Sequence, residues 1–265
     1  LNNDFHSSSL RVIFSMEKFS LRVASTPQEV ISAQRLRYQV FNVEMGRGLQ
    51  EAHATGLDRD AYDALCDHIL IIDNKTQETI GTYRLLLRSR LAGGSFYAEN
   101  EFDLTRLKSA LQGEVMEMGR SCVRRDHRRN DILNLLWSGI MDYMKRHHVA
   151  YIIGCPSLYT MDAAEISQAY AFLKRHHAAP EAWGVLPRPD KGVPGLTTDA
   201  RIDGQERRIR LKLPALVRSY LRIGAVVCGP PAIDREFGTV DFFMMLEVAR
   251  MAHDYLERFR VGDAA

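Results

Sequence analysis

Apolar and polar residues follow two different periodicities along this chain. Alternation or short apolar runs, bounded by turn residues, predict strands. Apolar residues that recur every three to four positions predict helices. The predicted strands are 19–24, 68–73, 79–87, 114–123, 149–156, 207–213, 225–232 and 239–246. The predicted helices are 26–41, 104–111, 130–146, 162–177 and 215–225.

Several local signals support this assignment. Thr26 is suited to cap a helix and Pro27 to occupy its first position. The turn at 74–78 joins two strands into a β-hairpin. Polar and acidic residues at 44–63, and Pro and Gly at 178–204, predict long loops.

The order of elements predicts an α/β (α+β) fold with a mixed, mostly antiparallel sheet flanked by helices. Regular βαβ repeats and a GxGxxG after the first strand are both missing, which argues against a doubly wound nucleotide-binding fold. We expect one domain at 16–265, with a C-terminal elaboration over about 178–265. Residues 1–15 are predicted to be a disordered leader outside this domain.

The amino-acid composition excludes only a few classes of protein. The chain has 265 residues, a formal net charge of +2 and four widely spaced cysteines. The small charge does not indicate a polyanionic partner, and no nucleic acid is expected. The cysteines lack metal-site spacing, so we expect free thiols and no metal.

No apolar run approaches the ~18–20 residues that span a bilayer. We expect a cytoplasmic protein with peripheral contact at the inner face of the membrane.

Glu117 lies between apolar residues on the predicted strand 114–123. Such a glutamate is either the partner of a structural ion pair or a general base. A bulge at Gly119 would bring Glu117 and Arg120 toward the same cavity.

A cluster of basic residues stands where that strand turns into the helix at 130. It contains Arg124, Arg125, Arg128 and Arg129. Amides at the start of a helix bind anions, and neighbouring arginines strengthen the field. The alternative is a solvated turn. The acidic loop that includes Glu44 and Asp63 is likewise either solvated or able to hold a cationic substrate.

The order of elements resembles the Gcn5-related N-acetyltransferase (GNAT) fold. In that fold the basic turn holds coenzyme A through Arg/Gln-x-x-Gly-x-Gly/Ala. Here Asp131 and Leu133 occupy the two glycine positions. This departure argues against acetyl-CoA as the donor.

Two acyltransferase families of this fold share longer motifs with the chain. The acyl-homoserine lactone synthases are similar in LRYQVF, DRDAYD, GTYRLL and EMGR. The ornithine-lipid biosynthesis acyltransferases are similar in RYQVFNVEMG, CDHILIID, FYAENEFDL, EMGRSCVRRDHR, YIIGCPSL and GPPAIDREFGTVDFF, in that order along the chain. The last of these motifs belongs to the ornithine-lipid type alone, so this second resemblance is the stronger.

This resemblance implies an enzyme that moves a long-chain 3-hydroxyacyl group from acyl carrier protein to the α-amine of ornithine, giving lyso-ornithine lipid. It implies no bound cofactor. Glu117 would be the base. The substrate would be bound by Arg37, Phe41, Glu44, Asp63, Arg84 and Arg120. The four arginines of the basic turn would face the phosphopantetheine or the carrier protein.

Three alternatives remain open at the level of the sequence. The acceptor is another amino acid, such as tyrosine or glycine, which would make the acidic loop irrelevant. The enzyme resembles an acyl-homoserine lactone synthase. Or the chain is a carrier-protein-binding module without activity, in which case Glu117 is structural.

Overall fold

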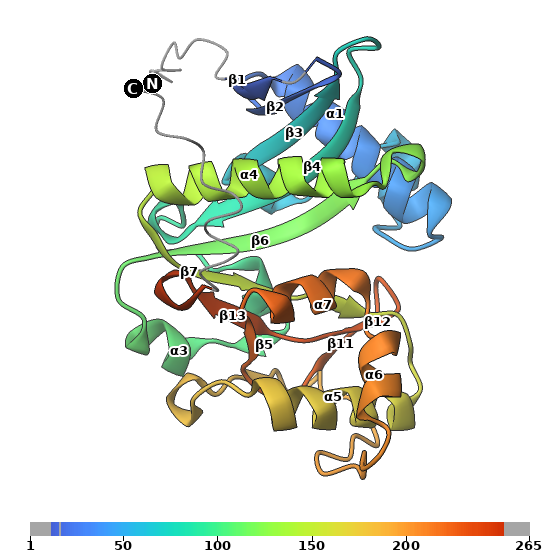
Figure 1. The fold of residues 1–265 in the computed structure, drawn as a ribbon, viewed down its shortest axis with the longest axis vertical. Coiled ribbons are helices and arrows are strands. Elements are labelled where there is room, and N and C mark those ends of the chain that lie inside the picture. Colours follow the sequence, from blue (N-terminus) through green and yellow to red (C-terminus); the bar gives the residue numbers. More distant parts are fainter. Residues whose placement is uncertain (1–11, 16, 252–265) are drawn as a thin grey trace. The chain divides into compact units, whose positions relative to one another are not determined.

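A computed structural model describes residues 12–15 and 17–251 of the chain (Figure 1). The described residues divide into two compact units. The first unit contains the residues up to 85 and 120–146, and the second contains 86–119 and 147–251. The long strand β6 (Glu114–Val123) contributes residues to both.

The first unit is built on antiparallel strands. In hydrogen-bonded order they are β1 (Val12–Ser15), β2 (Phe19–Val23), β3 (Asp67–Asp73), β4 (Thr79–Leu87) and then β6. Strand β1 belongs to the stretch that was predicted to be a leader, so this part of the stretch joins the sheet instead. The remainder of the predicted leader, residues 1–11, lies outside the described residues.

The helices of the first unit follow the predicted boundaries closely. They are α1 (Pro27–Tyr38), which continues into the π-helical turn η1 (Gln39–Glu44), then α2 (Ala52–Thr55), the 3-10 turns η2 (Ala61–Ala64) and η5 (Arg125–His127), and α4 (Asn130–Arg146). The Thr26 side chain accepts a hydrogen bond from the Glu29 amide, as the predicted cap requires. The predicted loop at 44–63 contains α2 and η2.

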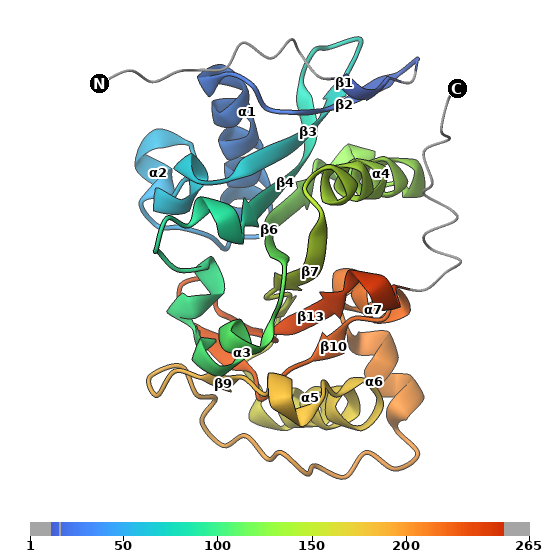
Figure 2. The ribbon, with the colours of Figure 1, turned by 90° about the vertical axis from the view of Figure 1, so that its left-hand side faces the viewer.

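The two longest helices of this unit cover opposite faces of its strands, as Figure 2 shows. Ala33 of α1 packs against Leu70 and Ile72 of β3. Leu21 of β2 points to the other face, where a Cβ on Gly139 of α4 would lie 2.6 Å from the Leu21 side chain. A side chain at 139 would therefore require the Leu21 side chain to shift.

The second unit has three groups of strands. The main group has the order β6, β7 (Val149–Gly154), β13 (Met244–Glu247) and β10 (Val226–Val227). Strand β7 is parallel to β6, and the remaining pairs are antiparallel. A three-stranded group has the order β11 (Ala232–Asp234), β12 (Thr239–Asp241) and β8 (Ser157–Leu158). Strands β5 (Phe102–Asp103) and β9 (Leu186–Pro187) form the third group.

The helices of the second unit are α3 (Thr105–Ala110), α5 (Ala163–His177), α6 (Glu206–Lys212) and α7 (Ala215–Arg222). Its 3-10 turns are η3 (Arg88–Arg90), η4 (Tyr97–Asn100), η6 (Glu181–Trp183) and η7 (Val248–Arg250).

One predicted strand was wrong, because residues 207–213 form α6 and its C-terminal end. Ile209, Leu211 and Leu213 alternate in the sequence, which suggested a strand. In the structure Ile209 and Leu213 are buried, whereas Leu211 is 65% exposed. Burial thus follows the four-residue spacing of a helix, and the alternation was misleading.

Candidate functional site

Arg37 is the centre of a buried group of charged side chains in the first unit. It lies on α1 and has no exposed surface. Its Nη1 and Nη2 donate hydrogen bonds to the two carboxylate oxygens of Asp63, at 2.9 and 2.8 Å. Its Nε lies 2.8 Å from Asp58 Oδ1, and its Nη2 also donates to the Asp58 carbonyl. Such a two-pronged contact fixes the geometry of both partners.

The aspartates of this group come from the segment that leads into η2. Asp60 caps that turn by accepting a hydrogen bond from the Tyr62 amide, and the Asp63 carboxylate accepts one from the Asp60 amide. Arg84 of β4 donates from Nη1 to Asp60, at 2.7 Å, and to Asp63, at 3.2 Å. Arg120 Nη2 lies 3.4 Å from Asp60 Oδ2. We call these six residues the Arg–Asp cluster: Arg37, Asp58, Asp60, Asp63, Arg84 and Arg120.

The formal charges of the Arg–Asp cluster cancel, since it has three arginines and three aspartates. Burial raises the pKa of Asp63, but the hydrogen bonds and charge of Arg37 and the charge of Arg84 outweigh it and hold that pKa well below its usual range. Burial lowers the pKa of Arg84, but Asp60 and Asp63 raise it above its usual value. Asp63 and Arg84 therefore keep their charges at neutral pH.

Two other predicted substrate-binding residues lie near the end of α1. The Phe41 side chain is partly buried and packs against a cluster formed by Leu36, Val40 and Cys122. Glu44 accepts two hydrogen bonds from Arg128, at 2.5 and 2.8 Å. Both acids that were predicted to hold a cationic acceptor, Glu44 and Asp63, are therefore paired with arginines of the chain itself.

The basic turn also contains mostly paired arginines. Arg124 pairs with Glu78 and Asp126, Arg128 with Glu44, and Arg129 with Asp131. Arg125 differs, because its exposed guanidinium makes no ion pair within the described residues. Exposed pairs of this kind are weak, so they can give way to a stronger anionic partner.

Glu117 is buried in the second unit, on the part of β6 that pairs with β7. Its Oε2 accepts a hydrogen bond from the Tyr97 amide and its Oε1 accepts one from the Ala98 amide, both at 2.7 Å. These donors fix the direction of the carboxylate. Each carboxylate oxygen can accept a second hydrogen bond, so the two contacts do not exhaust the group.

The backbone of β6 changes conformation just after Glu117. The parallel pairing with β7 ends where Glu117 faces Ile153. Arg120 has a φ of +51°, a left-handed conformation that is rare for a residue with a side chain. The sequence predicted a bulge at Gly119, but the left-handed residue is Arg120. Strain of this kind occurs where other contacts hold the residue in place, and here Asp58 and Asp60 supply them.

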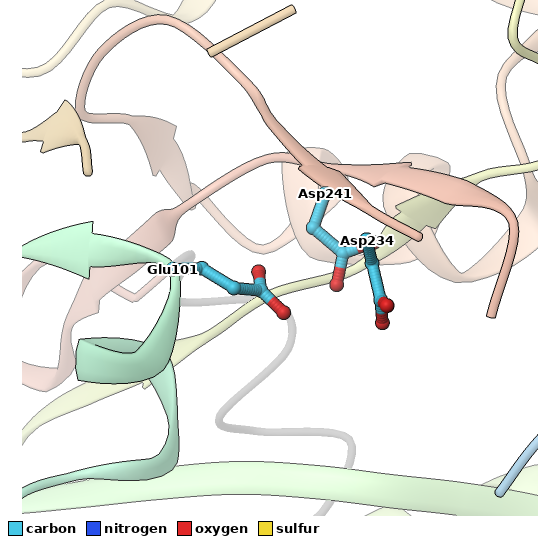
Figure 3. Close-up of side chains that lie close together, drawn as sticks. All are labelled: Glu101, Asp234 and Asp241. Atoms are coloured by element: carbon cyan, nitrogen blue, oxygen red, sulfur yellow. The ribbon is translucent and has the colours of Figure 1, made fainter. Parts of the chain in front are cut away.

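The second unit also contains an acidic group that the sequence did not predict as a site. Glu101 follows η4, Asp234 ends β11 and Asp241 ends β12. One carboxylate oxygen of each lies within 4.8 Å of the others, and all three side chains are buried (Figure 3). We call these three residues the acidic triad; their spacing is suited to a cation.

Asp234 and Asp241 share one face of the β11–β12 hairpin. Asp234 pairs with Thr239 across the two strands, and Asp241 is two residues further along. Residues two apart on a strand point to the same side, so the register brings the two aspartates together. Sequence spacing alone could not show that Glu101, more than a hundred residues away, faces them.

Comparison with known proteins identifies the family. The sequence model described as "Acetyltransferase (GNAT) domain" matches residues 36–138. An L-ornithine N(alpha)-acyltransferase of Rhodobacter capsulatus is 35% identical over 247 residues, which cover 90% of this chain and 93% of the relative. One of Brucella abortus with the same name is 31% identical, over 90% of this chain and 88% of the relative. The chain belongs to the L-ornithine Nα-acyltransferase family.

Structural similarity agrees with this family assignment at the level of the fold. A CoA-dependent acyl-homoserine lactone synthase, solved with SAM and isopentyl-CoA, is similar with a TM-score of 0.51 and 13% identity, over 88% of this chain and 81% of that one. The predicted GNAT-like fold and the predicted acyltransferase family are therefore confirmed. Within the described residues, no helix of this acyltransferase is long and apolar enough to cross a membrane.

The individual site residues remain predictions. The structure brings together Arg37, Asp63, Arg84 and Arg120, which the sequence had predicted as substrate-binding residues. Asp58 and Asp60 belong to the same cluster, and the DRDAYD motif had already drawn attention to them. The acidic triad was missed, although Glu101 lies in FYAENEFDL and both aspartates lie in GPPAIDREFGTVDFF.

Proposed function

We propose that this enzyme transfers a long-chain 3-hydroxyacyl group from acyl carrier protein to the α-amine of L-ornithine and produces lyso-ornithine lipid. The observation that carries the proposal is the 35% identity, over 90% of the chain, to an L-ornithine N(alpha)-acyltransferase. Because the product is a lipid, we place the reaction in the cytoplasm at the inner face of the membrane.

Glu117 is the proposed general base. Its carboxylate accepts a proton from the α-ammonium group of ornithine, directly or through one water molecule. The nitrogen lone pair then attacks the thioester carbonyl and an amide bond forms. The C–S bond breaks, and the pantetheine thiolate leaves and takes up a proton. The Tyr97 and Ala98 amides support this role because they hold the carboxylate in one direction.

The Arg–Asp cluster is the proposed rigid frame of the first unit. Arg84 and Arg120 were predicted either to hold the carboxylate of the acceptor or to brace the fold. Their contacts with Asp60 and Asp63 favour the bracing role. Positioning matters in an acyl transfer of this kind, because holding an amine in line with a thioester supplies a large part of the rate enhancement.

The basic turn is the proposed docking site for the acyl carrier. Arg125 is free to meet an acidic surface or the pantetheine phosphate, and Arg124, Arg128 and Arg129 would exchange their exposed pairs for such contacts. Attraction between opposite charges speeds the encounter of two proteins and depends on salt. We expect Arg125→Glu to raise the KM for acyl carrier protein several-fold at low salt and to leave kcat unchanged. Arg207→Glu, at an exposed position of α6, is the matched control.

The decisive experiment is a product assay by mass spectrometry. The purified enzyme receives 3-hydroxyacyl carrier protein and an equimolar mixture of all proteinogenic amino acids with ornithine. We expect one new mass, that of acyl-ornithine, and a loss of about 10²–10⁴-fold in Glu117→Gln, the range usual for a general base. Formation of a different acyl-amino acid would show that this other amino acid is the acceptor. Turnover with acyl-CoA, but not with acyl carrier protein, would show that acyl-CoA is the donor. Full activity in Glu117→Gln would exclude Glu117 as the base.

A further inference from the structure

The acidic triad contains a buried oxygen atom without a hydrogen-bond partner. Glu101 is 4% exposed, and its Oε2 accepts no hydrogen bond from the described residues. Figure 3 shows the Glu101 carboxylate directed toward Asp241 and Asp234. Leaving such an atom unsatisfied costs free energy, typically about 1–3 kcal/mol, and more when the group is charged. A group of this kind is satisfied by a water molecule, an ion or a ligand.

The negative charge of the triad is also poorly compensated. Neither Glu101 nor Asp234 forms an ion pair within the described residues. Asp234 Oδ1 accepts hydrogen bonds from the Glu236 and Phe237 amides, and Asp241 Oδ1 accepts one from the Thr239 hydroxyl. Lys191 is the basic residue whose charge acts on Glu101. Two of the three buried carboxyl groups, those of Glu101 and Asp234, therefore have no cationic side chain in ion-pair contact among the described residues, which suits the triad to a positive charge.

The three oxygens lie close enough together for one primary ammonium group to contact all of them. Such a group has three N–H donors and no acceptor. Oxygens that accept its hydrogen bonds at about 2.9 Å, in a tetrahedral arrangement, lie about 4.7 Å apart. The triad oxygens lie within 4.8 Å of one another.

The triad also lies near the proposed base. The charge of Glu117 acts on Glu101, and the charges of Glu101, Asp241, Glu117 and Asp234 all act on the thiol of Cys155. The two nitrogens of an extended ornithine are roughly 6 Å apart, given ordinary bond lengths. In the binding mode that follows, the α-amine of ornithine faces Glu117 and its δ-ammonium group faces the triad.

We propose that Glu101, Asp234 and Asp241 bind the δ-ammonium group of ornithine and so select this acceptor over neutral amino acids. The inference rests on the proposed function and names the acceptor subsite within it. It places the cationic end of the acceptor at a group in which Glu101 and Asp234 form no ion pair with another described residue. The sequence had placed it at Glu44 and Asp63, which Arg128, Arg37 and Arg84 already neutralise.

Proton release provides a signature of this binding mode. Burial, together with the charges of Asp241 and Asp234, raises the pKa of Glu101 to about 9, so Glu101 holds a proton at neutral pH while the site is empty. A bound ammonium group favours the ionised carboxylate. Ornithine binding near pH 7.5 should therefore release up to about one proton from Glu101. Calorimetry in two buffers of different ionisation enthalpy measures this release without any turnover.

The test compares ornithine with norleucine, in which a methyl group replaces the δ-ammonium group. In Glu101→Gln and Asp241→Asn, we expect kcat/KM for ornithine to fall by about 10- to 100-fold, chiefly through KM, as expected when a charged hydrogen bond is lost. Turnover of norleucine should be unchanged. Glu181→Gln, at an exposed position, is the matched control and should behave like the wild type. Unchanged norleucine turnover also shows that each variant is folded.

Each failure has a separate signature. If the wild type acylates ornithine and the triad variants keep the wild-type ratio of ornithine to norleucine, the proposed subsite is wrong and the proposed function stands. If that ratio changes in Glu44→Gln instead, the δ-ammonium group of ornithine binds at the acidic loop that includes Glu44. Calcium binding to the wild type that is lost in the variants, with the ratio intact, would assign the triad to a metal. No acylation of any amino acid by the wild type would overturn the proposed function itself.

Discussion

Buried carboxyl groups occur in both units of this acyltransferase, but their surroundings differ. In the Arg–Asp cluster of the first unit, Asp63 meets Arg37 and Arg84 within 3.2 Å. In the acidic triad of the second unit, Glu101 meets two other acids, and no described residue donates a hydrogen bond to its Oε2. The pKa of Asp63 is accordingly lowered, and that of Glu101 is raised to about 9.

The difference shows how burial and partners act together. Desolvation raises the pKa of a carboxyl group in either place, because it disfavours the charged form. In the first unit, arginines reverse the direction of the pKa shift of Asp63. In the second unit, neighbouring acids increase the upward pKa shift of Glu101. A buried carboxylate that arginines of its own chain neutralise, such as Asp63, braces a structure, whereas a buried carboxyl group without an ion pair among the described residues, such as Glu101, is available to a ligand.

The largest expected effect of a single change is in the Arg–Asp cluster. Arg37→Ala leaves Asp58 and Asp63 buried without their main partner, and breaking a buried pair in this way costs about 3–5 kcal/mol. Urea unfolding measures it through the fluorescence of Trp137, which lies in the first unit, in a Trp183→Phe background. The Arg146→Ala control removes an exposed pair with Asp142 and should cost at most about 1 kcal/mol. Equal losses in the two variants would contradict the comparison.

The next effect, compared for a change of one pH unit, is expected from the pH dependence of the second unit. The pKa of Glu101 rises from 4.5 to about 9 on folding, so the folded form holds a proton that the unfolded form releases. The free energy of unfolding should therefore fall as pH rises between these values, by up to about 1.4 kcal/mol per pH unit. Glu101→Gln should remove this slope, as followed by Trp183 fluorescence in a Trp137→Phe background without acceptor. A slope equal to that of the wild type would show that Glu101 is not the titrating group.

Asp63 provides the opposite sign within the same chain. Its pKa is lower in the folded form than in the unfolded form, so its contribution to stability is present above pH 3.8 and is lost as pH falls below this value. Between pH 4.5 and 9 the Asp63 contribution to the first unit should stay constant, while the Glu101 contribution to the second unit declines.

The smallest effect is expected on the surface. Arg128→Ala breaks the pair with Glu44, in which the Arg128 side chain is 42% exposed. An exposed pair contributes about 0–1 kcal/mol even when it is well formed. Urea unfolding followed through Trp137 should therefore change little. A loss above about 2 kcal/mol would show that this pair resembles the Arg–Asp cluster rather than a surface contact.

The sequence by itself determined the local elements and the family. The Thr26 cap, the β-hairpin at 68–87 and the helix after Asp162 depend on nearby residues, and each forms where it was predicted. Contiguous motifs also placed Arg37, Asp63, Arg84 and Glu117 in one family pattern. Where local spacing fitted two structures, as at 207–213, the prediction failed, because packing decided which residues were buried.

Only the tertiary structure decided which charges meet. Glu101 faces Asp234 and Asp241 because the β11–β12 hairpin presents both aspartates on one face, next to the end of η4. The partners of Asp63 come from α1 and β4, and Glu44 finds Arg128 across 84 residues. Whether an acid is neutralised or left open depends on such contacts between distant segments. Propensity and spacing describe only neighbours along the chain, so they cannot supply this information.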